Sequence, residues 1–567
     1  MKGPYQLPET TAARREFLSG AGLASLRGSP SRSGRPRRQG SIPLMRSRFN
    51  RRGNRPTVRP NRKPPLASLV LSRMGFGPRP GDIEDFLALG SDDDQRLLSY
   101  VEQQLDPDSI DDSELEARLQ QAGYTTLGKS LGQLWNDHVT AEGVDYRVRI
   151  QPLLELERAT FMRALYSRCQ LAELLADFWH NHFNVFAWDF PLFPIFVSYD
   201  RDVIRANMLG NFRQMLEAVA SSPAMLFYLD NFTNSSAGPN ENYARELFEL
   251  HTLGDENYLG VLRQSEVPLD QEGRPTGYVD DDVFEATRCF TGWTVAEESG
   301  SLTFRSDWHD RFQKSVMGQF FPPNQPDFQD GQQVLDLLVE HPGTGGHIAR
   351  KLVRRLVSDD PPEDLVQEAA QVFRSQKDSP DQLAQVVRTI LLSPHFRNDW
   401  GNKVKRPLEA ATGFLRACSA ELSLTTEDRF TDIFLYLYSH TQQSLFNWRS
   451  PDGYPDSQHD WLSGNPVVHS WRLFNWLVEE GDEGQYSLDI LGSTPASLRT
   501  APELADYWIE RILGRPMSAS DRRGIVDFMA QGRGSDIDLR WDVREPVQER
   551  LRSMVALIGM SPEFFWR

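Results

Sequence analysis

Apolar residues recur in steps of three and four along most of the chain from about residue 66, which is the spacing of amphipathic helices. Leu171, Leu174, Leu175 and Phe178 form one such stripe. Similar patterns cover 202–220, 240–253, 280–291, 332–340, 345–357, 362–374, 381–392, 403–420, 463–479, 501–513, 519–531 and 544–559. The best strand pattern is SLTF at 301–304. We therefore predict a mainly α fold, a large multi-helix globular body with at most a small β-hairpin.

Charge divides the chain into a basic arm and an acidic body. Residues 1–65 hold sixteen Lys and Arg against two Glu, a net of +14, so the total of −17 leaves −31 on the rest. Residues 28–65 are rich in Arg, Pro, Gly and Ser, a composition that buries little surface, and we predict a disordered basic arm there. An acidic body repels phosphates, so nucleic-acid binding by the folded part is disfavoured.

The first 27 residues contain a pattern typical of export signals. Arg14-Arg15 precede a modest apolar stretch from Phe17 to about Leu26, as in a twin-arginine leader, but no A-x-A cleavage site follows. Two alternatives remain open: export to the periplasm or beyond, or a non-functional remnant on a cytoplasmic protein. No apolar run is long enough for a transmembrane span, and no CxxC pair indicates a zinc ribbon.

Two histidines lie two residues apart in FWHNHFNVF, residues 178–186. Continuing the apolar stripe by four residues from Phe178 leads to His182, whereas His180 is about 200° away from His182 round a helix. We therefore expect His182 to face the interior and His180 to face elsewhere. A metal-binding pair would require an extended segment, in which residues i and i+2 share a face.

The segment PNENYARELFELHTLG, 239–254, places polar residues where an amphipathic helix has apolar ones. Asn240 and His251 fall inside the apolar arc, and Glu246 lies at its edge. The opposite side carries Glu241, Arg245 and Glu249, spaced for i,i+4 ion pairs. One interpretation is a structural polar network of Asn240, Glu241, Arg245 and Glu249. The other is a buried site using His251 and Glu246.

Further polar candidates follow in SDWHDRFQKSVMG, 306–318, where His309 and Asp310 precede Lys314 in a predicted loop. Adjacent His and Asp residues serve as acid–base groups in some proteins and are ordinary turn residues in others. The helix after His341 is basic, with His347, Arg350, Lys351, Arg354 and Arg355. Pairing with nearby acids and binding of an anion are both compatible with this pattern.

Taken together, these stretches resemble a bacterial family named domain of unknown function 1800. The matching words, in the family's order, are SRMGFGPRPGDIE, FWHNHFNVF, YLDNFTN, NENYARELFELHTLG, GYVDDDVFEATRCFTGW, HD…K…G, LDLLVEHPGTGGHIARKLVRRLVSDDPP, KVKRPLE and PDGYPDSQHDWL. The resemblance spans about 68–480 and implies a helical, often exported protein without a settled activity. Carried over by position, its motif residues are His182, Asn240, Glu241, Asn242, Arg245, Glu246, Glu249, His309, Asp310, Lys314, His341 and Lys351. We predict a leader or remnant at 1–27, the arm at 28–65, the family domain at 66–480 and a helical segment at 481–567 packed on the same body.

Two functional hypotheses follow. In the first, the protein is an exported enzyme with a hydrolytic or metal-assisted site, in which His182, His251 and Glu246 bind a divalent metal. Glu246, His309 and Asp310 are then the candidate catalytic residues. In the second, the protein is a non-enzymatic envelope or secretion-linked scaffold that binds a protein partner, and its buried polar groups are structural.

Overall fold

The computed structural model describes residues 63–480 and 486–567. The predicted leader and nearly all of the predicted arm lie outside the described residues. Helices dominate the rest, which confirms the predicted fold class. None of the helices in the two described ranges has the length and apolar character needed to cross a bilayer.

The N-terminal part of the body contains the following helices. They are α3 (Leu66–Arg73), α4 (Asp82–Ala88), α5 (Asp93–Leu105), α6 (Ser113–Gln121), α7 (Leu131–Leu134), α8 (Tyr146–Tyr166), α9 (Gln170–His182), α10 (Leu192–Ser198), α11 (Phe212–Ser221), α12 (Pro223–Tyr228), α13 (Asn242–Glu246), α14 (Asp280–Cys289), α15 (Gln329–Glu340), α16 (Pro342–Leu356), α17 (Glu363–Ser375), α18 (Gln382–Leu391) and α19 (Pro394–Asn398). Three wider π-helical turns occur among them: η2 (Trp135–Thr140), η3 (Tyr199–Arg205) and η5 (Leu247–His251).

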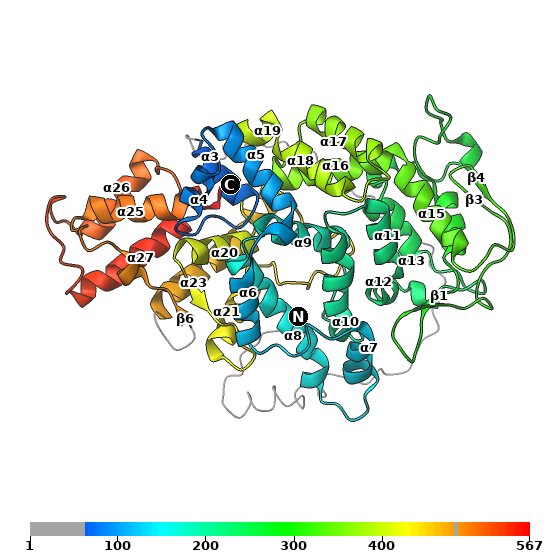
Figure 1. Ribbon diagram of the computed structural model, residues 1–567, viewed down its shortest axis with the longest axis horizontal. Coiled ribbons are helices and arrows are strands. Elements are labelled where there is room, and N and C mark those ends of the chain that lie inside the picture. The colour runs from blue at the N-terminus through cyan, green and yellow to red at the C-terminus, as the bar shows by residue number, and fades with distance from the viewer. Residues whose placement is uncertain (1–62, 481–485) are drawn as a thin grey trace, which may run out of the picture.

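The C-terminal part adds α20 (Pro407–Ala417), α21 (Arg429–Ser439), α22 (Gln458–Trp461), α23 (Gly464–Glu480), α24 (Ile490–Ser493), α25 (Ala501–Leu513), α26 (Ala519–Ala530), α27 (Glu545–Met560) and α28 (Pro562–Phe565). Helices α25 to α27 lie at one end of the molecule, and α15 with strands β3 and β4 lies at the other (Figure 1). The C-terminus returns to the middle of the molecule, beside α3.

Strands within the described residues form three antiparallel pairs. They are β1 (Trp293–Val295) with β2 (Leu302–Phe304), β3 (Lys314–Val316) with β4 (Gln319–Phe321), and β5 (Glu421–Leu422) with β6 (Tyr486–Ser487). The predicted hairpin at 301–304 is therefore confirmed, with Thr303 opposite Thr294. The two further pairs were not predicted from the sequence.

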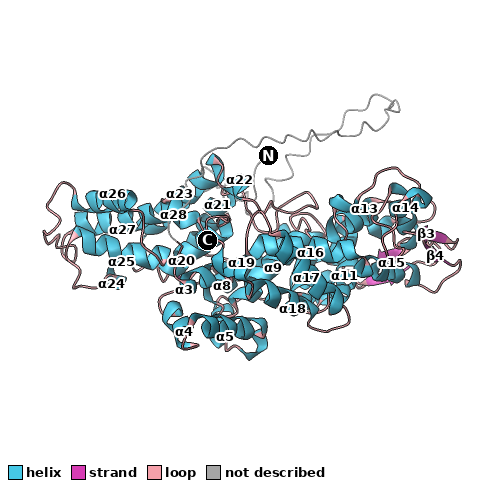
Figure 2. Cartoon of the chain, turned by 90° about the horizontal axis from the view of Figure 1, so that it is seen from above, coloured by secondary structure: helices cyan, strands magenta, loops and turns pink. Residues whose placement is uncertain are grey.

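Two apolar cores hold the body together. One is built mainly from elements between α3 and α18, and the other from α8, α20, α21 and the helices from α23 onward. Helix α9 lies near the middle, close to α16 (Figure 2). The predicted stripe on α9 is confirmed, because Leu171, Leu174 and Leu175 have no exposed surface.

A buried ion-pair network ties α9, α16 and α20 together. Asp177 on α9 pairs with Arg355 of α16 at 3.2 Å and also with Arg406. Glu409 on α20 pairs with Arg355 and, at 2.7 Å, with Arg567. Removing one member of such a network leaves an uncompensated buried charge, which costs about 3–5 kcal/mol. The network therefore fixes the position of α16, the helix that carries His347 and Lys351.

Most predicted helices differ from the observed ones by a few residues at their ends, and two of them are not continuous regular helices. The predicted helix at 202–220 is interrupted, because the side chain of Asn211 accepts from the backbone of Arg213 and Gln214 and starts α11 anew. The predicted helix at 240–253 begins two residues later, at Asn242, and its second half is the π-helical turn η5. The wider turn changes the direction in which His251 points relative to a regular helix.

Candidate functional site

The two histidines of FWHNHFNVF lie on different sides of α9, and both sides are covered. His182 is 1% exposed, so its predicted inward position is confirmed. The expectation that His180 lies outside the interior is wrong, since its side chain is 9% exposed. Helix α9 is surrounded by other elements, so facing away from His182 does not mean facing solvent.

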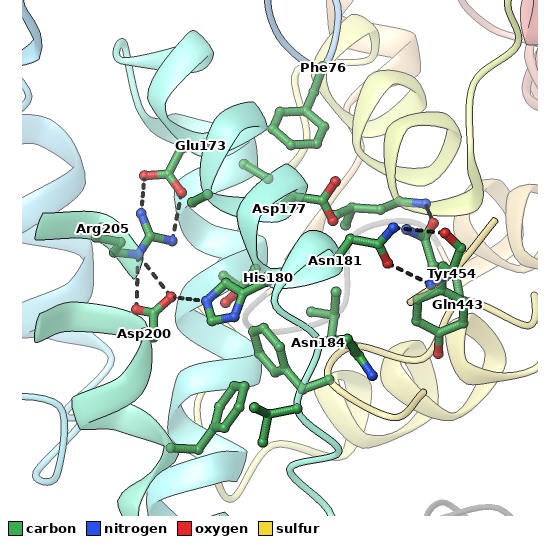
Figure 3. Close-up of a pocket in the computed structure, with 18 residues that line it drawn as sticks. Phe76, Glu173, Asp177, His180, Asn181, Asn184, Asp200, Arg205, Gln443 and Tyr454 are labelled. Atoms are coloured by element: carbon green, nitrogen blue, oxygen red, sulfur yellow. Dashed lines mark hydrogen bonds and ion pairs between the residues drawn. The ribbon is translucent and has the colours of Figure 1, made fainter. Parts of the chain in front are cut away.

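His180 belongs to a chain of ion pairs shown in Figure 3. Its Nε2 atom donates to Asp200 at 2.9 Å, Arg205 pairs with Asp200 at 2.9 Å, and Arg205 also pairs with Glu173 at 2.9 Å. Burial alone would raise the pKa of Asp200, but Arg205 and His180 hold this pKa below its usual range. A cavity of about 40 Å³ adjoins the chain and has room for about three water molecules. These pairs attach η3 to α9.

The two asparagines of the same motif hold a distant loop. The side chain of Asn181 donates to the main-chain oxygen of Tyr454 at 2.7 Å and accepts from its N–H at 2.6 Å. The amide of Asn184 donates to the main-chain oxygens of Trp448 at 3.0 Å and Ser450 at 2.8 Å. These bonds fix the PDGYPD segment, and with it Asp452, against the end of α9.

The opposite side of α9 carries a cluster of imidazole rings. The Nε2 atom of His182 donates to the main-chain oxygen of His251 at 3.2 Å. The ring centroids of His182 and His251 are 6.3 Å apart, and those of His182 and His347 are 6.2 Å apart. His347 also contacts Glu256, with Nδ1 and Oε1 3.1 Å apart. Three separate segments, α9, η5 and α16, therefore meet at this point.

His251 has an unusual environment. Its side chain has no exposed surface, and neither ring nitrogen has a hydrogen-bond partner within the described part of the chain. Burial, followed by the electrostatic effects of Lys351 and of the nearby His347, lowers the pKa of His251 to about 3. The pKa of His182 is lowered well below its usual value for the same reasons. Both rings are therefore neutral at physiological pH.

Lys351 lies one helical turn after His347 on α16. Its half-buried side chain makes no ion pair or hydrogen bond with any residue in 63–480 or 486–567. Burial and the nearby Arg354 lower its pKa to about 8, against the opposing effect of Asp456, Glu256 and Asp452. A substantial fraction of this amine is therefore uncharged slightly above neutral pH.

The choice of lysine at this position is informative. The chain contains eight lysines and 54 arginines. Two other buried lysines have carboxylate partners: Lys314 pairs with Asp330 at 2.6 Å, and Lys403 pairs with Asp456 at 2.9 Å. Lysine, unlike arginine, can lose its proton when it is buried. Lys351 therefore differs from Lys314 and Lys403 in having no carboxylate partner within the described residues.

Glu246 lies at the end of α13 and is partly exposed. Burial, then the charge of Glu249, raises its pKa to about 7, with Asp452 adding to the effect and Arg245 opposing it. The charge of Asp452 thus acts on both Glu246 and Lys351. The loop held by Asn181 and Asn184 brings these two groups into one electrostatic environment.

The structure does not assemble the predicted metal ligands His182, His251 and Glu246. His182 uses Nε2 for the carbonyl of His251, and the charges that act most strongly on Glu246 are those of Glu249, Arg245 and Asp452. Among the described residues, no group of three or more His, Cys, Asp or Glu side chains is placed to hold a metal ion.

The predicted catalytic residues His309 and Asp310 belong to a different network. His309 contacts the main-chain oxygen of Thr291 at 2.8 Å and Asp330 at 3.2 Å. Asp310 pairs with Arg288 at 2.8 Å. Neither residue pairs with Glu246, His251 or Lys351 within the described ranges. The observed bonds therefore fasten the loop before β3 to α14 and α15.

The predicted polar network around α13 is partly formed. Arg245 pairs with Glu241 at 2.9 Å and with Asp280 at 3.4 Å, and Glu249 is not among its ion-pair partners in the described chain. Asn240 accepts from the backbone N–H of Asn242 at 3.1 Å and so begins the helix. Arg245 thus joins α13 to α14 and does not extend a ladder along one helix.

Several basic side chains on α16 pair with acidic residues of the same protein. Arg350 pairs with Glu363 at 2.9 Å, Arg355 joins the buried network, and the side chain of His341 accepts from the N–H of Gly343 at 3.0 Å at the start of the helix. The interpretation of α16 as an ion-paired helix is confirmed for these arginines. Arg354 makes a hydrogen bond of 3.4 Å to the main-chain oxygen of Asp359 and no ion pair, and Lys351 makes neither within the described ranges.

Fold and site thus define a helical protein in which α9, η5 and α16 meet at a cluster of three histidines, with an unpaired lysine one turn further along α16. The chain matches the model of the family described as "Protein of unknown function (DUF1800)" over residues 69–566, and it belongs to that family. The resemblance inferred from the motifs is confirmed. No curated protein and no solved structure matches the chain.

Proposed function

We propose that this protein is an enzyme that uses Lys351, Glu246 and His251 for acid–base chemistry of a hydrolytic type. The observation that carries the proposal is that α16 brings His347 and the unpaired Lys351 to the histidine cluster, where Lys351 acts electrostatically on His251, whose ring nitrogens have no hydrogen-bond partner in the described chain. Buried polar groups without partners cost about 1–3 kcal/mol each. Such a cost is expected where the groups serve a substrate.

The roles follow from charge and protonation. Glu246, with its pKa raised to about 7, can both accept and donate a proton near neutral pH, as a general acid–base group must. Lys351 in its charged form would stabilise negative charge that develops on an attacked group, and its lowered pKa lets it donate a proton. His251, neutral and unbonded, would orient the substrate by a hydrogen bond. Titratable groups shifted toward neutrality cluster at functional sites, which supports this assignment.

The direct test is turnover of ester, amide and glycoside substrates by the purified protein. We expect Glu246→Gln and Lys351→Met each to lower kcat/KM by about 10²–10⁴, the usual contribution of a general acid–base group. The matched control is Lys377→Met, which removes an exposed lysine paired only with Glu340. Full activity of the Glu246→Gln variant contradicts the proposed role.

Export is a separate part of the proposal. The pair Arg14-Arg15 before a short apolar stretch supports transport through a twin-arginine pathway. Cell fractionation of the full chain and of an Arg14→Lys, Arg15→Lys double variant tests this directly. If the wild-type chain and the double variant divide between cytoplasm and periplasm in the same proportion, export by this signal is contradicted.

A second candidate function, binding of another protein in the envelope, rests on exposed apolar side chains near β3 and β4. Val261 is 85% exposed and Phe320 64% exposed. Their segments are joined by a hydrogen bond of 2.6 Å from Gln264 to the main-chain oxygen of Ser315. Loss of a co-purifying envelope partner from a Val261→Asp, Phe320→Asp variant, with turnover unchanged, would support this function.

A further inference from the structure

A second unpaired lysine lies far along the chain from Lys351. Lys405 precedes α20, and its backbone N–H donates to the main-chain oxygen of Phe565 at 2.7 Å. The side chain is buried, at 9% exposure, and Nζ lies 3.6 Å from the centroid of the Phe564 ring. Within the described ranges Nζ has no carboxylate or other acceptor at bonding distance. Lys403, two residues earlier, is paired with both Asp359 and Asp456.

The charged neighbours of Lys405 are mainly positive. Arg567 and Arg515 repel a proton on the amine, and Glu409 alone favours it among the charges that act most strongly. Two acidic side chains of this region already have partners of their own: Glu409 pairs with Arg567, and Glu563 pairs with Arg515. Burial, followed by the charge of Arg567, lowers the pKa of Lys405 to about 7. Near neutral pH, the amine is therefore about half uncharged and nucleophilic.

A small cavity of about 20 Å³ adjoins this amine. Its walls include Lys405, the aromatic rings of Trp400, Phe564 and Trp566, and the carboxylate of Glu563. This volume has room for about one or two water-sized molecules, so it admits only a very small reactant.

We propose that Lys405 is a carbamylation site that reacts reversibly with carbon dioxide. The neutral Nζ attacks the carbon of CO₂ and forms an N–C bond. One C=O π pair moves onto oxygen, and a proton leaves the nitrogen for solvent, which gives a lysine carbamate anion. Arg567 and Arg515 repel the ammonium form of Lys405. The carbamate anion that the reaction produces is attracted by the same two arginines. This change of sign favours CO₂ over an aldehyde, whose imine product carries no negative charge.

The test uses the full-length protein equilibrated with ¹³C-bicarbonate near pH 8. We expect a carbamate carbon resonance in the wild-type protein that is absent from Lys405→Arg, which keeps the charge but cannot react. Trapping with an alkyl-oxonium reagent, followed by peptide mass spectrometry, should label Lys405 at least about tenfold more than the exposed Lys377. This ratio is expected because each unit of pKa changes the neutral fraction tenfold.

The Lys403→Arg variant is the matched control, because it changes a paired lysine in the same segment and should keep the resonance. The thermal midpoint of the wild-type protein should also rise with bicarbonate, and that of Lys405→Arg should not. A wild-type spectrum without the resonance, or equal trapping at Lys405 and Lys377, overturns the proposal. Capture of a small aldehyde by borohydride reduction at Lys405, without a carbamate signal, would also overturn it.

Discussion

The Nε2 atom of His182 lies 3.2 Å from the main-chain oxygen of His251, so one motif histidine holds the backbone of another. This contact gives the two histidines different roles. His182 positions the π-helical turn, whereas His251 keeps both ring nitrogens free of partners in the described chain. Residues that orient a site and residues that act in it can thus be tested separately.

Replacing His182 with alanine should destabilise the protein by about 2–4 kcal/mol, through a lost hydrogen bond and an internal cavity. Denaturant unfolding at pH 7 measures the effect. The control is His459→Ala at an exposed position, where a change within about 0.5 kcal/mol is expected. Equal stability of the two variants would show that the contact with His251 contributes little.

Gly254 should not tolerate a side chain. Its φ is +85°, and a Cβ atom there would collide with the side chains of His347 and Glu256. Gly254→Ala should therefore lower stability by about 1–3 kcal/mol more than Gly260→Ala. Gly260 has a similar φ of +77° and no atom within 4 Å of its Cβ position, so it controls for backbone strain alone. An equal loss of stability in both variants would mean that the side chains of Glu256 and His347 can move aside without an energetic penalty.

The raised pKa of Glu246 predicts a definite pH dependence. Between about pH 4.5 and 7 the folded protein binds more protons at this group than the unfolded chain, so stability falls as pH rises through this range. The stability of Glu246→Gln relative to wild type should therefore increase from pH 4.5 to 7 and stay constant above it. Unfolding curves of both proteins at several pH values provide the comparison. A constant difference over this range would show that the pKa of Glu246 is ordinary.

The fold class could be predicted from the sequence because helical periodicity requires only local spacing. The stripe of Leu171, Leu174 and Leu175 specified α9, and the family words identified the segments that meet around it. The break at Asn211 and the π-helical turn before His251 could not be predicted, since both depend on local hydrogen bonds that override the periodic pattern.

The candidate site was only partly predictable. His251 and Glu246 were selected because they interrupt an apolar face, and both have strongly shifted pKa values. The role of Asp452 was missed, because it depends on bonds from Asn181 and Asn184 across more than 250 residues. Lys351 could not be distinguished from the other basic residues of its helix by position alone, although the scarcity of lysine in this chain was a usable signal.

The most direct test of the central claim compares the stabilities of two lysine variants. If Lys351 serves a substrate and not the fold, Lys351→Met should raise the free energy of unfolding at pH 7 by about 1 kcal/mol. This gain should shrink as the pH rises from about 8 to 10.5, because Lys351 is then neutral in the folded wild-type protein and its desolvation no longer lowers stability. Lys314→Met, which removes the ammonium partner of the buried Asp330 and leaves it only His309 and Gln325, should instead lose about 3–5 kcal/mol. A loss of similar size in both variants would contradict the account.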